Sequence, residues 1–182
     1  MSFPVYSVRV ERNDPPRYSR DMRRRARDPQ SRAKSCVPRL RVPVFRVVLR
    51  KDRTIRVPET HVSMPAMAAR VAHALIGDSP FEKMLAILIG GRSQILGAII
   101  IATTSTVSST AVSIRGVFVG AIAHNASAIV LAHNHPSGEA RPSDEDVLFG
   151  RKANEASGIL QIPILDHLIV TPDPEVWTTI TC

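Results

Sequence analysis

The chain has 182 residues, of which 44% are hydrophobic and 22% charged, and it contains only two cysteines, Cys36 and Cys182. This composition suits one globular domain with an additional segment, and it excludes a disulfide framework or a zinc site built from cysteine pairs. The chain therefore reads as intracellular, and we expect a cytoplasmic location. No apolar run approaches the about 20 residues of a membrane span, so we expect no membrane partner.

The net charge of +8 is concentrated in the first third of the chain. Residues 1–57 hold 17 bases and 5 acids, whereas residues 58–182 hold 7 bases and 11 acids. An Arg-rich tract of this kind can contact a nucleic-acid backbone, and a solvated arm explains it equally well. We expect a basic arm at residues 1–41, largely disordered or loop, and name residues 9–56 as a candidate DNA contact.

Apolar residues alternate with a period of two in two short segments near the N-terminus. The segments are residues 4–10 and 43–49, and each pattern predicts a half-buried strand. Between them the chain contains four prolines and little periodicity, which indicates a loop. We therefore place the start of the compact domain near Val42, so that it covers residues 42–182.

The next elements are a helix and a hairpin. A helix is expected over residues 66–76, because Pro65 suits the first turn and Gly77 provides a stop. Residues 82–89 and 94–102 are rich in Ile and Leu and are joined by glycines, which predicts two buried strands connected as a hairpin.

The second half of the chain adds two more helices and further strands. The expected elements are a helix within residues 112–125, a strand over 127–132, a helix over 142–157 closed by Gly158, a strand over 162–171 and an edge strand at Trp177. Strands that alternate with helices in this order predict an α/β sandwich around a mixed sheet.

Two histidines and an aspartate carry the strongest chemical signal. His133 and His135 are two residues apart at the end of a predicted strand, so their side chains point the same way. If Ser143 caps the following helix, Asp146 lies in its first turn, where its carboxylate can return to the imidazoles. Such a set matches a catalytic zinc site with a fourth position for water. Zinc is the expected metal, and iron or manganese would suit the same ligands.

The sequence around these residues is similar to a known family. Residues 133–138 (His-Asn-His-Pro-Ser-Gly) and 142–146 (Pro-Ser-Asp-Glu-Asp) resemble the RadC-like branch of the JAMM (MPN+) metalloproteases, whose motif is His-x-His, seven residues, then Ser-x-x-Asp. The resemblance extends over residues 42–178. It implies an MPN/JAB1-like (cytidine-deaminase-like) three-layer sandwich around a mixed β-sheet.

The resemblance also implies a role for each site residue. His133, His135 and Asp146 would hold Zn²⁺, Glu82 would act as general base and then general acid through the zinc water, and Ser143 would steady the oxyanion. Zinc lowers the pKa of bound water to about 7, and a nearby carboxylate can accept its proton. The implied activity is that of a zinc-dependent metallopeptidase or isopeptidase acting on an amide bond of a peptide or isopeptide substrate.

The sequence departs from the family pattern at two places. Gly116 stands where the family usually has an acid, and residues 89–91 (Ile-Gly-Gly) replace a Leu-Asp pair. Neither position is a proposed ligand.

Several of these residues also have simpler structural explanations. The Ser143 and Asp146 pair is a capping signal in its own right. Glu82 can mark the solvent edge of a strand. His167 can be a satisfied core histidine, or it can donate to a carboxylate beside the metal site.

Two other functions compete with the hydrolase. The first is a nucleic-acid-associated accessory protein, of the DNA repair or recombination type, that binds through the Arg-rich arm. The second is an MPN scaffold that only assembles partners, and Glu82 argues against it because a scaffold needs no general base. The sequence carries no signal for a particular oligomeric state.

Overall fold

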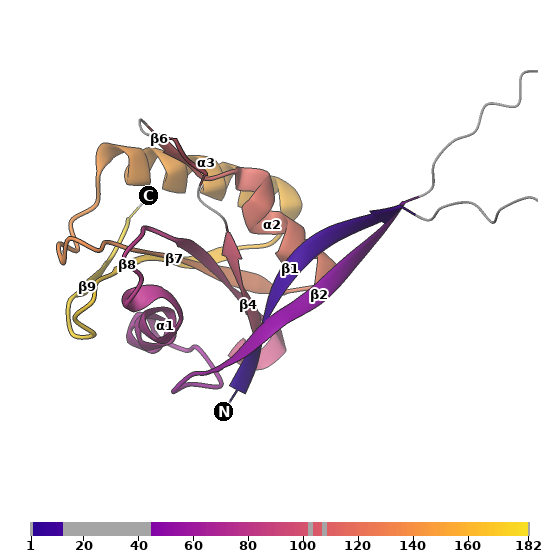
Figure 1. The fold of residues 1–182 in the computed structure, drawn as a ribbon, viewed down its shortest axis with the longest axis horizontal. Helices are drawn as coiled ribbons and strands as arrows, with labels where there is room; N and C mark the ends of the chain where they lie inside the picture. Colours follow the sequence, from indigo (N-terminus) through magenta and orange to yellow (C-terminus); the bar gives the residue numbers. More distant parts are fainter. Residues whose placement is uncertain (1, 13–44, 102–103, 107–108, 182) are drawn as a thin grey trace, which may run out of the picture. The chain divides into compact units, whose positions relative to one another are not determined.

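A computed structural model of the chain describes residues 2–12, 45–101, 104–106 and 109–181 (Figure 1). The Arg-rich tract and most of the expected arm at residues 1–41 lie outside these ranges. Residues 2–8 and 49–181 belong to one compact unit, and residues 9–12 and 45–48 belong to a second. The helices and all the predicted site residues belong to the first unit.

Within the described ranges, seven strands form one mixed sheet in the order β2-β1-β4-β3-β7-β8-β9. The strands are β1 (Ser2–Arg12), β2 (Phe45–Arg56), β3 (Met84–Ile89), β4 (Ile95–Ile101), β7 (Ala128–Asn134), β8 (Ile164–Val170) and β9 (Trp177–Thr179). Strand β3 is antiparallel to β4 and β7, whereas β7 is parallel to β8. The mixed sheet expected from the sequence is therefore present.

Among the described residues, three α-helices cover the two faces of this sheet. They are α1 (Pro65–Ala72), which continues into the π-helical turn η2 (His73–Gly77), α2 (Ile114–Ala123) and α3 (Asp144–Leu160). Buried residues of α1, such as Val71, pack with one face of the sheet, and Phe118 of α2 and Ala153 of α3 pack with the other (Figure 1). This arrangement confirms the three-layer sandwich.

The hairpin of β3 and β4 lies in the middle of the sheet. All six residues of β3 and all seven of β7 are buried, because helices cover both faces of these strands. A short 3₁₀ turn, η3 (Gly91–Ser93), connects β3 to β4. The buried strands β3 and β7 thus support the segments that adjoin their ends.

The sequence did not predict a small second sheet in the Ser/Thr-rich link. Strands β5 (Thr104–Thr106) and β6 (Ser109–Ala111) pair there as an antiparallel two-stranded sheet. These strands are only three residues each and lack the Val and Ile periodicity that identifies longer strands.

The predicted end of the last helix was wrong. Helix α3 passes through Gly158 and ends at Leu160, and Gln161 then takes the left-handed conformation with φ of 56°. The amide of Ile162 donates to the carbonyl of Ser157, as in a helix that closes one turn later than predicted. A glycine inside a helix therefore gave a false stop signal.

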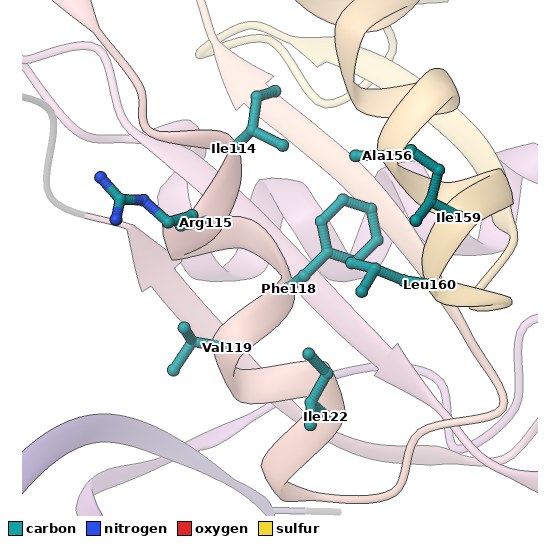
Figure 2. Close-up of a pocket in the computed structure, with 8 residues that line it drawn as sticks. All are labelled: Ile114, Arg115, Phe118, Val119, Ile122, Ala156, Ile159 and Leu160. Carbon is teal, nitrogen blue, oxygen red and sulfur yellow. The ribbon is translucent and has the colours of Figure 1, made fainter.

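An apolar groove lies between α2 and α3 (Figure 2). Its walls include Phe118 and the exposed side chains of Ile122 and Ile159, and Arg115 is its one charged residue. The groove contains none of the predicted site residues. Among the residues that the structure describes, no helix has both the length and the apolar composition needed to cross a lipid bilayer.

Candidate metal centre

Four predicted site residues from distant parts of the chain meet at one end of the central strands. A ligand atom from each of Glu82, His133, His135 and Asp146 lies within 4.8 Å of the others. Glu82 lies in the segment before β3, the histidines lie at the end of β7, and Asp146 is in the first turn of α3. The structure thus brings together four of the five residues named from sequence, and Ser143 adjoins them as the N-cap of α3.

Strand β7 places both imidazoles on the same side of the sheet. His133 is the penultimate residue of β7 and is 1% exposed, and His135 follows the end of the strand. Their Nε2 atoms are 3.0 Å apart. Nδ1 of His135 is 2.8 Å from the carbonyl oxygen of Glu139, so in the neutral ring Nδ1 carries the proton. Nε2 of His135 therefore presents a lone pair to the cluster.

The N-terminus of α3 fixes the orientation of the Asp146 carboxylate. Oδ2 of Asp146 accepts hydrogen bonds from the backbone amide of Ser143 at 2.8 Å and from its hydroxyl at 2.7 Å. The hydroxyl oxygen of Ser143 in turn accepts from the amide of Asp146 at 3.1 Å. These bonds form a capping box, so the cap both starts the helix and directs the carboxylate toward the histidines.

The carboxylate and the imidazoles change the acidity of one another. Partial burial favours the neutral form of Asp146, but the hydrogen bonds with His133 and His135 outweigh it and hold the pKa of Asp146 far below its ordinary value. The nearby carboxylate of Asp146 stabilises the protonated ring and raises the pKa of His135 above 6.5, although partial burial opposes this shift. Asp146 is therefore ionised at neutral pH, as a ligand carboxylate must be.

The donor atoms have the separations that a tetrahedral ion requires. Nε2 of His133 is 3.2 Å from Oδ1 of Asp146, and Nε2 of His135 is 3.6 Å from Oδ2. Two ligand atoms at about 2.0 Å from a tetrahedral zinc lie about 3.3 Å apart. The separations between neighbouring donors, which involve both carboxylate oxygens of Asp146, are 3.0 to 3.6 Å and lie close to this value, so the residues present fit a zinc ion.

Sequence reasoning missed Asn134, which links the histidines to the segment that carries Glu82. Its side chain is fully buried and accepts a hydrogen bond from the amide of Lys83 at 2.8 Å. It also donates to the carbonyl oxygens of Ser79 at 3.1 Å and Phe81 at 3.2 Å. Because these contacts lie on both sides of Glu82, they fix its position relative to β7.

We expect Asn134→Ala to destabilise the protein by at least about 2 kcal/mol, because it leaves buried backbone groups of residues 79–83 without partners. Urea unfolding of the metal-free protein measures the change. Asn134→Asp is the matched variant of equal size, and we expect it to lose stability as well, since a carboxylate cannot donate to two carbonyls. A loss below about 0.5 kcal/mol in the alanine variant would contradict the bracing role.

The raised pKa of His135 predicts how metal binding depends on pH. A proton on His135 is stabilised by Asp146, and its contribution to folding is complete below pH 6.5 and is lost as the pH rises through the raised pKa. A metal must displace that proton, so metal affinity should rise with pH both at 6.5 and above it. Calorimetric zinc titrations at several pH values test this, and constant affinity from about pH 6 to 8 would contradict it.

The remaining histidines differ in their surroundings. His61 is exposed, His73 makes a hydrogen bond with the carbonyl of Pro172, and His124 lies at the end of α2. None of these three belongs to the cluster. His167 of β8 is buried beside His133, with 5.4 Å between ring centroids, and the satisfied core histidine expected from sequence is not what the structure shows, as argued below.

Comparison with known proteins gives a family match and many relatives. The RadC-like JAB domain model matches residues 62–178. A UPF0758 protein of Thermosynechococcus vestitus is 36% identical over 112 residues, which cover 62% of this chain and 44% of that protein. A UPF0758 protein of Aromatoleum aromaticum is 41% identical over 96 residues, which cover 53% of this chain and 42% of that protein. A UPF0758 protein of Methanosarcina mazei is 28% identical over 127 residues, which cover 70% of this chain and 55% of that protein. The chain thus spans about half the length of the curated relatives it matches.

Proposed function

Because this chain belongs to the RadC-like JAB domain family, we propose that it is a zinc-dependent peptidase or isopeptidase that hydrolyses an amide bond. The family and the cluster together fit a metal-dependent hydrolase. The single observation that carries the proposal is the convergence of Glu82, His133, His135 and Asp146 at separations that suit one ion. A site that only stored a metal would have no use for a carboxylate beyond the three ligands.

His133, His135 and Asp146 are the residues that would hold the ion. When bound there, zinc would polarise a substrate carbonyl and lower the pKa of a water molecule to about 7. The hydrogen bond from His135 to Glu139 and the capping box around Asp146 keep both donors directed at the same point. The ligands are therefore preorganised, and little ordering is required when the metal binds.

Glu82 is the proposed general base and general acid. Its carboxylate lies within 4.8 Å of the ligand atoms, a distance that one water molecule can bridge. It can accept a proton from the attacking water and deliver it to the nitrogen of the leaving amine. The amide C–N bond then breaks, and the products are a carboxylate and an amine.

Ser143 is proposed to assist at the oxyanion, in addition to its capping role. Its hydroxyl donates to Asp146 in this structure, so a bond to substrate oxygen requires the hydroxyl to rotate away from the carboxylate. Ser143→Ala removes both functions, whereas Ser143→Asn can retain a cap.

Hydrolysis can be tested with the zinc-loaded chain and a panel of fluorogenic peptides and lysine-linked isopeptides in ¹⁸O-labelled water. The proposal expects cleavage that a chelator abolishes and zinc restores, with one ¹⁸O atom in the product carboxylate. Zinc-loaded protein that cleaves no member of the panel, or cleavage that a chelator leaves unchanged, would count against it.

The charge of the first third of the chain supports a second proposal, that residues 9–56 contact nucleic acid. The excess of bases over acids in residues 1–57 is 12. Each phosphate neutralised makes binding weaker in salt, so affinity for duplex DNA should fall steeply between low and physiological salt. If the affinity for duplex DNA does not change with salt concentration, or if His133→Ala abolishes binding, the contact is not made by residues 9–56.

A further inference from the structure

Three buried imidazole nitrogens beside the metal cluster have no explanation in the proposed chemistry. Among the residues that the structure describes, neither ring nitrogen of His167 has a hydrogen-bond partner, and Nδ1 of His133 has none either. His167 is 5% exposed and His133 is 1% exposed. A buried polar group without a partner destabilises the folded state, so such a group needs a specific reason to persist.

The register of the sheet places these two rings together. In the parallel pair of β7 and β8, His167 is opposite Leu131 and Ile169 is opposite His133. Opposite residues of a parallel pair point to the same face, so His167 and His133 share a face as diagonal neighbours. Their ring centroids are 5.4 Å apart and the ring planes are tilted by 58°. The ring of Phe149 in α3 contacts His167 edge-on, with 6.0 Å between the two ring centroids.

His133 requires an acceptor for the proton on Nδ1 if it ligates through Nε2. Nε2 of His133 faces His135 and Asp146, so it is the nitrogen that must keep a lone pair for a metal. In the neutral ring the proton then resides on Nδ1, and ligating histidines almost always donate that proton to a neighbouring group. His135 meets this requirement through Glu139, whereas no residue described in the structure does so for His133.

We propose that His167 is a positioning residue for the metal centre: its imidazole accepts the hydrogen bond of the His133 Nδ1 proton through one bridging water molecule. The structure shows no direct hydrogen bond between the two rings, whose centroids are 5.4 Å apart, so a link between them requires a bridging water, and a buried water typically makes about three hydrogen bonds. A neutral imidazole offers one acceptor and one donor, and both ring nitrogens of His167 are buried without a partner among the described residues. The inference rests on the proposed function, since it assigns His167 a role in metal binding.

The test measures zinc affinity of the full chain by competition with a chromophoric chelator. His167→Phe fills the same space and removes both nitrogens, and we expect its affinity to fall about 10- to 100-fold. His167→Asn and His167→Gln place an amide near the positions of Nδ1 and Nε2, respectively, and at least one of them should restore most of the affinity. Phe149→Leu is the matched control, because it alters the packing of His167 without removing a hydrogen-bonding group.

A second readout follows the tautomer of His133 directly. The ¹H and ¹⁵N shifts of its ring should report a hydrogen-bonded proton on Nδ1 in the zinc-loaded wild type, and in zinc-loaded His167→Phe that proton should lose its hydrogen-bonded shift. Thermal unfolding of each metal-free variant shows whether it folds. If His167→Phe does not fold, His167→Leu is used in its place.

The outcomes separate this inference from the proposed function. Wild-type affinity in a folded His167→Phe or His167→Leu would overturn the role of His167. An equal loss of zinc affinity in the apolar variant and in both amide variants would also overturn it. The site would then require the shape of the imidazole and not its hydrogen bond. A wild-type chain that binds no zinc would instead remove the proposed function on which the inference rests.

Discussion

The Glu82→Gln variant is expected to bind zinc as tightly as the wild type and to hydrolyse an isopeptide about 10²- to 10⁴-fold more slowly. The carboxylate of Glu82 lies close to the ligands but is additional to the three that fill a catalytic zinc site. Glutamine keeps the size and polarity of the side chain but cannot accept a proton. Metal content by mass spectrometry and initial rates on one substrate measure the two effects.

Glu145→Gln is the matched control for this substitution. Glu145 is an exposed acid in the first turn of α3, next to the proposed ligand Asp146 in sequence. We expect its rate and metal content to equal those of the wild type. If Glu82→Gln retains the wild-type rate, or if the two variants lose activity equally, Glu82 is not the general base.

His133→Ala is expected to lower zinc affinity by more than about 100-fold, since removal of a ligand must exceed the 10- to 100-fold effect of removing a partner of a ligand. Two N/O donors from His135 and Asp146 would remain, and catalytic zinc sites use three. Because His133 is buried, the alanine also creates a cavity, so unfolding of the metal-free protein must be measured beside zinc affinity.

Asp146→Asn avoids the cavity, because it keeps the shape of the side chain and an oxygen that can accept from Ser143. We expect it to lose zinc affinity to a similar extent. His61→Ala removes an exposed histidine outside the cluster and should bind zinc normally. Wild-type affinity in both His133→Ala and Asp146→Asn would show that the ion binds elsewhere.

The grouping of His133, His135 and Asp146 could be predicted because it depends on local rules. Two histidines two apart at the end of a strand share a face, and a serine three residues before an aspartate at a helix start forms a capping box. Both patterns are fixed within a few residues. Glu82 was different: it is about 50 residues from the histidines in sequence, and only the family resemblance identified it. Pairing of β3 with β7 brings it to them, and a single sequence does not contain that pairing.

The residues that sequence reasoning missed act through long-range contacts. The side chain of Asn134 points away from the histidines on either side of it, and its hydrogen bonds join backbone groups of residues 79–83. His167 was expected to be satisfied in the core, but burial without a partner is visible only when the neighbouring strands are in place. The end of α3 was missed for a local reason, because Gln161 rather than Gly158 takes the left-handed position.

A crystal structure of the zinc-loaded chain tests the central claim most directly. We expect one zinc ion bound by Nε2 of His133, Nε2 of His135 and the carboxylate of Asp146 at about 2.0 to 2.2 Å, with a solvent molecule in the fourth position and within hydrogen-bond distance of Glu82. Zinc bound elsewhere, a carboxylate of Asp146 turned away from the imidazoles, or a Glu82 carboxylate beyond reach of that solvent molecule would contradict the account.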